Sequence, residues 1–193
     1  MTKGLSTLQF VFPDGQVPDW YQGPEKALAL VAGFDERYES LKTIFDSGYL
    51  DSYDRVKDLE KLSGDFFWAW MTSSPAVIAA LGSPKVMEIL ELFSTYRGIT
   101  WEYEHYAYYE QLPDHIEIFR GGSGTLDNVL LGFSWSLSKE IAEQFANSSL
   151  DGILLRAEIA KKDVLLVSSL ECELVPRLSS LSNVVQIHPS HKA

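Results

Sequence analysis

IEIFRGGSG, residues 116–124, is the stretch at which the chain changes from helical to strand-like patterns. Apolar residues alternate with Glu117 at its start, which is typical of a half-buried β-strand. Arg120 follows at the expected end of this strand, directly ahead of a glycine-rich turn. A guanidinium stays charged at physiological pH, so a position beside a core requires an anionic or strongly polar partner. The stretch therefore raises the question of what Arg120 binds.

The chain before this stretch has helical periodicity. Within residues 24–45, apolar side chains recur at spacings of three and four, which predicts one amphipathic helix whose core-facing residues are Val31, Phe34, Tyr38, Leu41 and Phe45. Further helices are expected at about 55–71, 75–81, 84–95 and 99–111. Pro75 and Pro84 stand at first-turn positions of two of these helices, where the missing N–H costs nothing.

The chain from Ile116 onward consists of short β-type runs with one expected helix, residues 139–146, for which Ser138 is the predicted N-cap. The runs are IEIF, GFSWS, GILLRAEI, DVLLV, ECELV and NVVQI. We therefore expect an α+β fold in a single domain, residues 1–193, with helices packed on a strand-rich core. The mainly helical part covers 1–112 and the β-rich core covers 113–193.

Composition narrows the function classes. The net charge of −11 argues against a nonspecific nucleic-acid binder, which needs a basic face toward the phosphates. Cys172 is the single cysteine, which excludes an internal disulfide framework. There is no apolar run of roughly 18 residues, as a membrane span requires. These features predict a cytoplasmic protein without a membrane partner, and the four histidines have no metal-ligand spacing.

Three features of the β-rich part are candidates for a binding or catalytic role, although each also has an ordinary structural interpretation. Glycines after Arg120 allow a ligand to approach the backbone, or they form a plain turn. In GFSWS, alternation places Ser134 and Ser136 on one strand face, toward a cleft or toward solvent. In ECELV, Glu171 and Glu173 share a strand face with Cα atoms roughly 6.6 Å apart, while Cys172 points the other way as a buried filler. Two neighbouring carboxylates repel each other unless a ligand or partner separates them.

The ordered combination of Arg-Gly, Ser-x-Ser and Glu-x-Glu resembles the Arg-Ser-Glu class of mono-ADP-ribosyltransferases, which includes many toxins. The resemblance covers residues 116–187 approximately. It implies that NAD is the co-substrate, that no metal is required, and that the acceptor of ADP-ribose is a protein, with arginine as the acceptor side chain.

The resemblance also implies a role for each motif residue. Arg120 binds the nicotinamide-side phosphate and ribose of NAD, and Gly121 offers its backbone to the nicotinamide amide. Ser134 orients the catalytic glutamate, and Ser136 braces the strand. Glu173 binds the ribose 2′-OH and stabilises the oxocarbenium-like transition state as nicotinamide departs. Glu171 positions or deprotonates the acceptor.

The sequence is also compatible with three functions other than a transferase. An NAD glycohydrolase uses the same Arg120, Ser134 and Glu173 but delivers the ribose to water. A glycoside hydrolase also uses paired carboxylates but leaves the Arg-Gly feature unexplained. A non-catalytic inhibitor or binding module uses its acidic charge to reach a basic partner.

Overall fold

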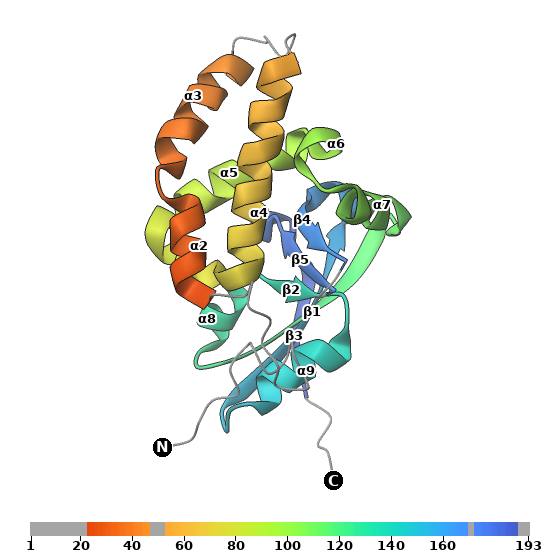
Figure 1. Cartoon of the computed structure of the whole chain (residues 1–193). Helices are drawn as coiled ribbons and strands as arrows, with labels where there is room; N and C mark the ends of the chain where they lie inside the picture. Colours follow the sequence, from red (N-terminus) through yellow and green to blue (C-terminus); the bar gives the residue numbers. More distant parts are fainter. Residues whose placement is uncertain (1–22, 47–52, 170–171, 189–193) are drawn as a thin grey trace. The chain divides into compact units, whose positions relative to one another are not determined.

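The computed structural model describes residues 23–46, 53–169 and 172–188, and Figure 1 shows its helices and strands. These residues divide into two compact units, a helical unit that ends at Tyr106 and a sheet unit that begins at Ala107. Helices and an antiparallel six-stranded sheet are both present, so the predicted α+β class is confirmed. Glu171, one of the predicted site residues, lies outside the described residues.

The helical unit follows the predicted pattern with two corrections. Its helices are α2 (Gly23–Val31), α3 (Phe34–Asp46), α4 (Tyr53–Leu81), α5 (Ser83–Thr95) and α6 (Arg97–Thr100), and α7 (Tyr103–Gln111) crosses the boundary of the units. The helix predicted within 24–45 is two helices, because Gly33 takes a φ of 65°, a conformation that breaks the helix and favours glycine. The helix predicted at 99–111 is also two, because Trp101 is extended.

α4 contains a kink at Ser73, whose φ is −165° and ψ is 87°. The kink lies between the helices expected at 55–71 and 75–81, and Pro75 follows it closely. In the part of the chain that the structure describes, no helix is both long enough and apolar enough to cross a bilayer.

The core of the helical unit is a cluster of buried aromatic rings around Phe66. Its ring centroid lies 5.6 Å from that of Phe34, 5.7 Å from that of Phe93 and 6.0 Å from that of Trp70. All four side chains are almost fully buried. Because aromatic side chains bury the largest apolar area per residue, this cluster is the main hydrophobic contribution that joins α3, α4 and α5.

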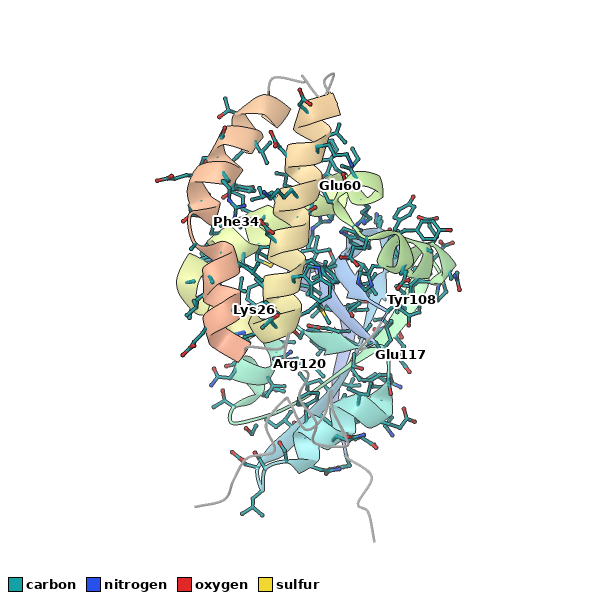
Figure 2. The ribbon with its side chains drawn as sticks, viewed as in Figure 1. Lys26, Phe34, Glu60, Tyr108, Glu117 and Arg120 are labelled. Carbon is teal, nitrogen blue, oxygen red and sulfur yellow. The ribbon has the colours of Figure 1, made fainter. Side chains whose placement is uncertain are left out.

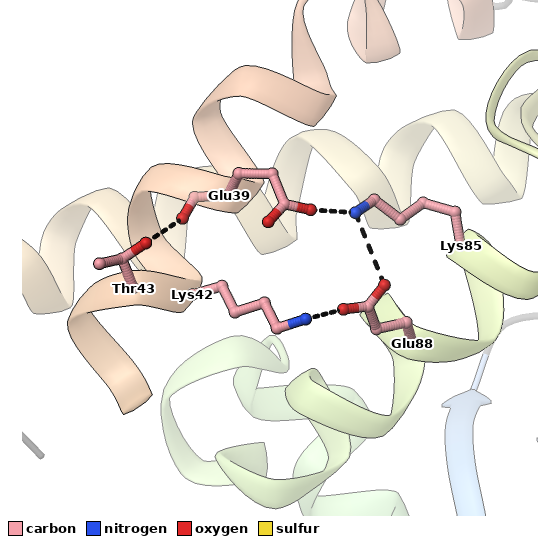
Figure 3. Close-up of polar contacts among 5 residues, drawn as sticks. All are labelled: Glu39, Lys42, Thr43, Lys85 and Glu88. Carbon is pink, nitrogen blue, oxygen red and sulfur yellow. Dashed lines mark hydrogen bonds and ion pairs between the residues drawn. The ribbon is translucent and has the colours of Figure 1, made fainter. Parts of the chain in front are cut away.

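An ion-pair network on the surface of the helical unit links α3 to α5 (Figure 3). Lys42 pairs with Glu88, and Lys85 pairs with Glu39 and, at 3.5 Å, with Glu88. The hydrogen bond from Lys42 is the main cause of a lowered pKa at Glu88. Since these side chains are partly exposed, solvent screens the network and it contributes little beyond holding the two helices in register.

The sheet unit has six antiparallel strands in the order β4-β5-β2-β1-β3-β6. The strands are β1 (His115–Ser123), β2 (Trp135–Ser136), β3 (Gly152–Ala160), β4 (Val164–Ser168), β5 (Glu173–Pro176) and β6 (Ser182–Ile187). α8 (Leu126–Leu130) and α9 (Lys139–Asn147) flank β2 in sequence. α9 and its N-cap, Ser138, confirm the prediction for this segment, whereas the short α8 was not expected.

α9 packs on one face of β1 and β3 at very close range. An added Cβ at Gly121 would lie 1.8 Å from the Ala142 oxygen, and one at Gly152 would lie 1.8 Å from the Ala146 oxygen. The absence of side chains at these two strand positions therefore lets the helix backbone approach the sheet. The close contact buries a small apolar cluster formed by Phe119, Ala142, Ala146 and Leu154.

Candidate functional site

The three predicted motifs lie on three adjacent strands in the middle of the sheet. Arg120 lies in β1, Ser136 in β2 and Glu173 at the start of β5, and the sheet order places β2 between the other two. Ser136 pairs with Glu173 in β5 and with Phe119 in β1, so Ser136 and Glu173 lie in one row across the strands and Arg120 follows that row by one residue. Residues that are far apart in the sequence thus become neighbours, all within the sheet unit.

Arg120 lies inside β1, which continues to Ser123, and not at the strand end that the sequence predicted. Its Nε donates a hydrogen bond of 2.6 Å to the Val129 oxygen, and Nη1 donates to the Ser134 oxygen. Its guanidinium also lies against Gly132, where an added Cβ would come within 1.7 Å of Nη2. Figure 2 labels Arg120 and Glu117, two points along β1. The partners of Arg120 in this structure are therefore main-chain carbonyls between β1 and β2.

The Arg120 guanidinium has capacity for a further acceptor. A guanidinium carries five N–H donors, of which two donate to these carbonyls, and the other three have no acceptor among the described residues. Burial lowers the pKa of Arg120, and the nearby charge of Glu173 opposes that shift. Arginine remains charged in proteins, so the site combines a half-buried cation with a carboxylate two strands away.

Ser134 and Ser136 lie in different surroundings, whereas the sequence predicted that both lie on one face of the same strand. β2 contains only Trp135 and Ser136, so Ser134 lies just outside the strand. The physical reason is that the Ser134 carbonyl accepts a hydrogen bond from Arg120 and not from a neighbouring strand. Ser136 is buried, and its hydroxyl accepts a 3.0 Å hydrogen bond from the Ser138 N–H and donates one of 3.5 Å to the Cys172 oxygen. Its hydroxyl thus joins β2 to the residue before Glu173.

Glu173 begins β5, and the regular Glu-x-Glu strand predicted from the sequence is wrong at Cys172. That residue has a φ of 48°, in the left-handed region that non-glycine residues rarely adopt. Its carbonyl accepts a 2.8 Å hydrogen bond from the Leu137 N–H in addition to the bond from Ser136. Cys172 is half-buried rather than a buried filler. The turn conformation at Cys172 therefore sets where the Glu173 side chain emerges.

Gly121 has a structural role that the sequence did not indicate. A side chain at this position would point into α9, and the Gly121 backbone pairs with Leu154 of β3. The structure thus explains why a glycine follows Arg120 without reference to a ligand.

Tyr108, which belongs to none of the three predicted motifs, lies near the site. Burial raises the pKa of its phenol, and so does a hydrogen bond with the Cys172 thiol. This contact anchors the second half of α7 beside the turn that precedes Glu173. In the sequence Tyr108 is one of four tyrosines within α7, with Tyr103, Tyr106 and Tyr109, and an aromatic cluster in a helix is most often packing.

No protein-family model, curated protein or solved structure matches the chain. Across residues 23–46, 53–169 and 172–188, no group of three or more His, Cys, Asp or Glu side chains forms a metal-binding cluster.

Proposed function

We propose that this chain is a mono-ADP-ribosyltransferase that moves ADP-ribose from NAD to a protein acceptor and releases nicotinamide. The observation that carries the proposal is the adjacency of β5, β2 and β1, which brings together the three motifs of the resemblance. The arginine lies in β1, the second serine of the Ser-x-Ser motif in β2 and the glutamate in β5, which are three consecutive strands of the sheet. The β core is accordingly proposed to be of the ADP-ribosyltransferase type.

Arg120 is the residue proposed to hold the diphosphate side of NAD. Its remaining N–H donors suit phosphate oxygens, which guanidinium groups bind in bidentate fashion. The two carbonyl contacts fix the guanidinium before a ligand arrives, which reduces the entropy lost on binding. Gly121 is proposed to contact the nicotinamide amide through its backbone.

Glu173 is the residue proposed to stabilise the transition state. Nicotinamide leaves NAD as a neutral molecule, so bond cleavage needs no general acid; it needs negative charge beside the oxocarbenium that develops on the ribose. The carboxylate of Glu173 supplies that charge, and the Ser136–Cys172 hydrogen bond stabilises the turn from which it projects. Ser134 is proposed to orient the carboxylate, and Glu171, by its place in the motif, to handle the acceptor.

The test is the release of nicotinamide from NAD by the purified chain and by Glu173→Gln, with Glu117→Gln as the matched control. Glu117 is an exposed carboxylate of the same sheet that pairs with Arg156 at 3.5 Å. We expect Glu173→Gln to lose about 100-fold or more in kcat and Glu117→Gln to lose nothing. Equal rates above background in all three proteins would overturn the role of Glu173. No turnover and no NAD binding would remove the proposal in favour of a non-catalytic binding module.

Acceptor dependence separates transfer from hydrolysis. Stimulation of nicotinamide release by a cell lysate, with ADP-ribose appearing on arginine in mass spectra, supports the transferase. Release that a lysate leaves unchanged identifies an NAD glycohydrolase. Glu171→Ala should lose transfer while it keeps slow hydrolysis, and equal loss of both would show that the acceptor role of Glu171 is wrong.

A further inference from the structure

Ser168 is a buried serine directly across from Glu173. It ends β4, Glu173 begins β5, and the two residues are register partners in the hairpin that these strands form. The Ser168 side chain is 2% exposed, and its Oγ has no hydrogen-bond partner in the part of the chain that the structure describes. Buried hydroxyls are nearly always hydrogen-bonded, so this one requires an explanation.

The row of paired residues places a serine on each side of Glu173, Ser136 in β2 and Ser168 in β4. Side chains directly opposite in an antiparallel pair share a face, with Cβ atoms roughly 4.5–5.5 Å apart. The single O–H of Ser136 donates to the Cys172 oxygen, so it is already committed. The O–H of Ser168 donates to no acceptor among the described residues, and its register position is directly opposite Glu173.

We propose that Ser168 is a positioning residue, whose hydroxyl donates a hydrogen bond to the Glu173 carboxylate when NAD occupies the site. This inference rests on the proposed function. The bond fixes the rotamer of Glu173 so that one carboxylate oxygen faces the ribose. Glu173 then receives an orienting hydroxyl from β4, on the side away from the Ser-x-Ser motif, in addition to the one proposed for Ser134.

Because the Ser168 hydroxyl has no hydrogen-bond partner among the described residues, its removal should change stability differently from the removal of a structural serine. Removal of an unpaired buried polar group leaves stability unchanged or raises it, whereas removal of a bonded one lowers stability. Ser168→Ala should therefore keep or raise the unfolding midpoint while it lowers kcat. Its KM for NAD should stay near the wild-type value, because Ser168 contacts the carboxylate and not the ligand.

The experiment measures nicotinamide release and the thermal unfolding midpoint for wild type, Ser168→Ala and Ser168→Cys, with Ser182→Ala as control. Ser182 is a serine of the edge strand β6 whose hydroxyl bonds the Glu158 oxygen at 3.2 Å. We expect kcat to fall about 10- to 100-fold in Ser168→Ala, because misplacement of a catalytic group has effects of this size. Ser168→Cys keeps a weak hydrogen-bond donor, so its kcat should lie between those of wild type and Ser168→Ala.

The outcomes separate this inference from the proposed function. A wild type that releases nicotinamide in a Glu173-dependent way, with Ser168→Ala at wild-type kcat, overturns the inference and leaves the function standing. A fall in the midpoint of Ser168→Ala larger than that of Ser182→Ala also overturns it, because the hydroxyl then has a structural partner. A wild type without NAD turnover overturns both.

Discussion

The guanidinium of Arg120 donates a hydrogen bond to the main-chain oxygen of Ser134, 14 positions later in the chain. A second bond, from Nε, reaches the Val129 oxygen at 2.6 Å. Together they hold α8 and the segment that leads from it to β2 beside β1. Arg120 thus stabilises the sheet unit through the same group that is proposed to bind NAD, and substitutions at this position affect both properties.

Arg120→Lys should lose both properties together. An ammonium group cannot reproduce the planar fork that donates to two carbonyls at once, so at least one buried acceptor loses its partner. We expect a loss of about 1–3 kcal/mol in the free energy of unfolding, measured by urea denaturation. NAD binding, measured by calorimetry, should fall below detection. Arg156→Lys, at an exposed ion pair on β3, is the control and should change stability by less than about 1 kcal/mol.

Gly132→Ala should impair NAD binding more than it impairs folding. The new methyl group would lie 1.7 Å from Nη2 of Arg120, so the guanidinium must move. The end of a side chain shifts at lower cost than backbone, and we expect a loss below that of Arg120→Lys in unfolding free energy. NAD affinity should fall at least about tenfold, which corresponds to roughly 1.4 kcal/mol. Wild-type NAD affinity in this variant would contradict the role of Arg120 in binding.

Gly121→Ala should destabilise the sheet unit. Its Cβ would overlap the Ala142 oxygen of α9, which is backbone and cannot move without displacing the helix. We expect a cost of about 3 kcal/mol, at the upper end for overpacking, visible as a lower thermal midpoint. Gly64→Ala is the matched control, because nothing lies within 4 Å of its Cβ and it sits inside α4. That change should be neutral or stabilise by up to about 1 kcal/mol.

His105 should make the stability of the helical unit fall in mild acid. Its side chain is buried, and its ring centroid lies 4.4 Å from that of Phe67. Burial lowers the pKa of His105, with the nearby Glu102 and Glu104 acting in the opposite direction. In the unfolded chain histidine takes up a proton near pH 6.5, so below that pH the unfolded state binds more protons and stability decreases until the folded pKa is reached.

The measurement is urea denaturation at pH 7.5 and pH 5.5 for wild type and His105→Gln. The substituted protein should show a smaller difference between the two pH values, because it lacks the titrating ring. A wild-type difference that His105→Gln preserves would assign the acid sensitivity to other groups.

Local sequence patterns were sufficient for the elements whose causes are local. α9 was predicted with its N-cap because the Ser138 hydroxyl accepts from the Ile141 N–H within the same few residues. β1, β3, β4 and β6 were predicted because apolar and β-branched runs show directly in the sequence. The α+β class followed from the order of these elements.

Long-range contacts decided the features that sequence patterns missed. The GFSWS run gave a strand of only two residues, because a guanidinium from β1 takes the carbonyl of Ser134. The ECELV run did not continue through Cys172, whose carbonyl is held by Leu137 and Ser136. In each case the hydrogen-bond donors lie outside the run that they interrupt.

By itself the sequence determined the types of the main elements and the three motifs, since propensity, capping and periodicity act over a few residues. Only the tertiary structure decided that β5, β2 and β1 are neighbours and that Ser168 stands opposite Glu173. Strand order and register depend on how the whole sheet closes and on which side chains fill its core. The serine in VLLVS therefore has no recognisable role in the sequence, and its position opposite Glu173 appears only in the β4–β5 hairpin.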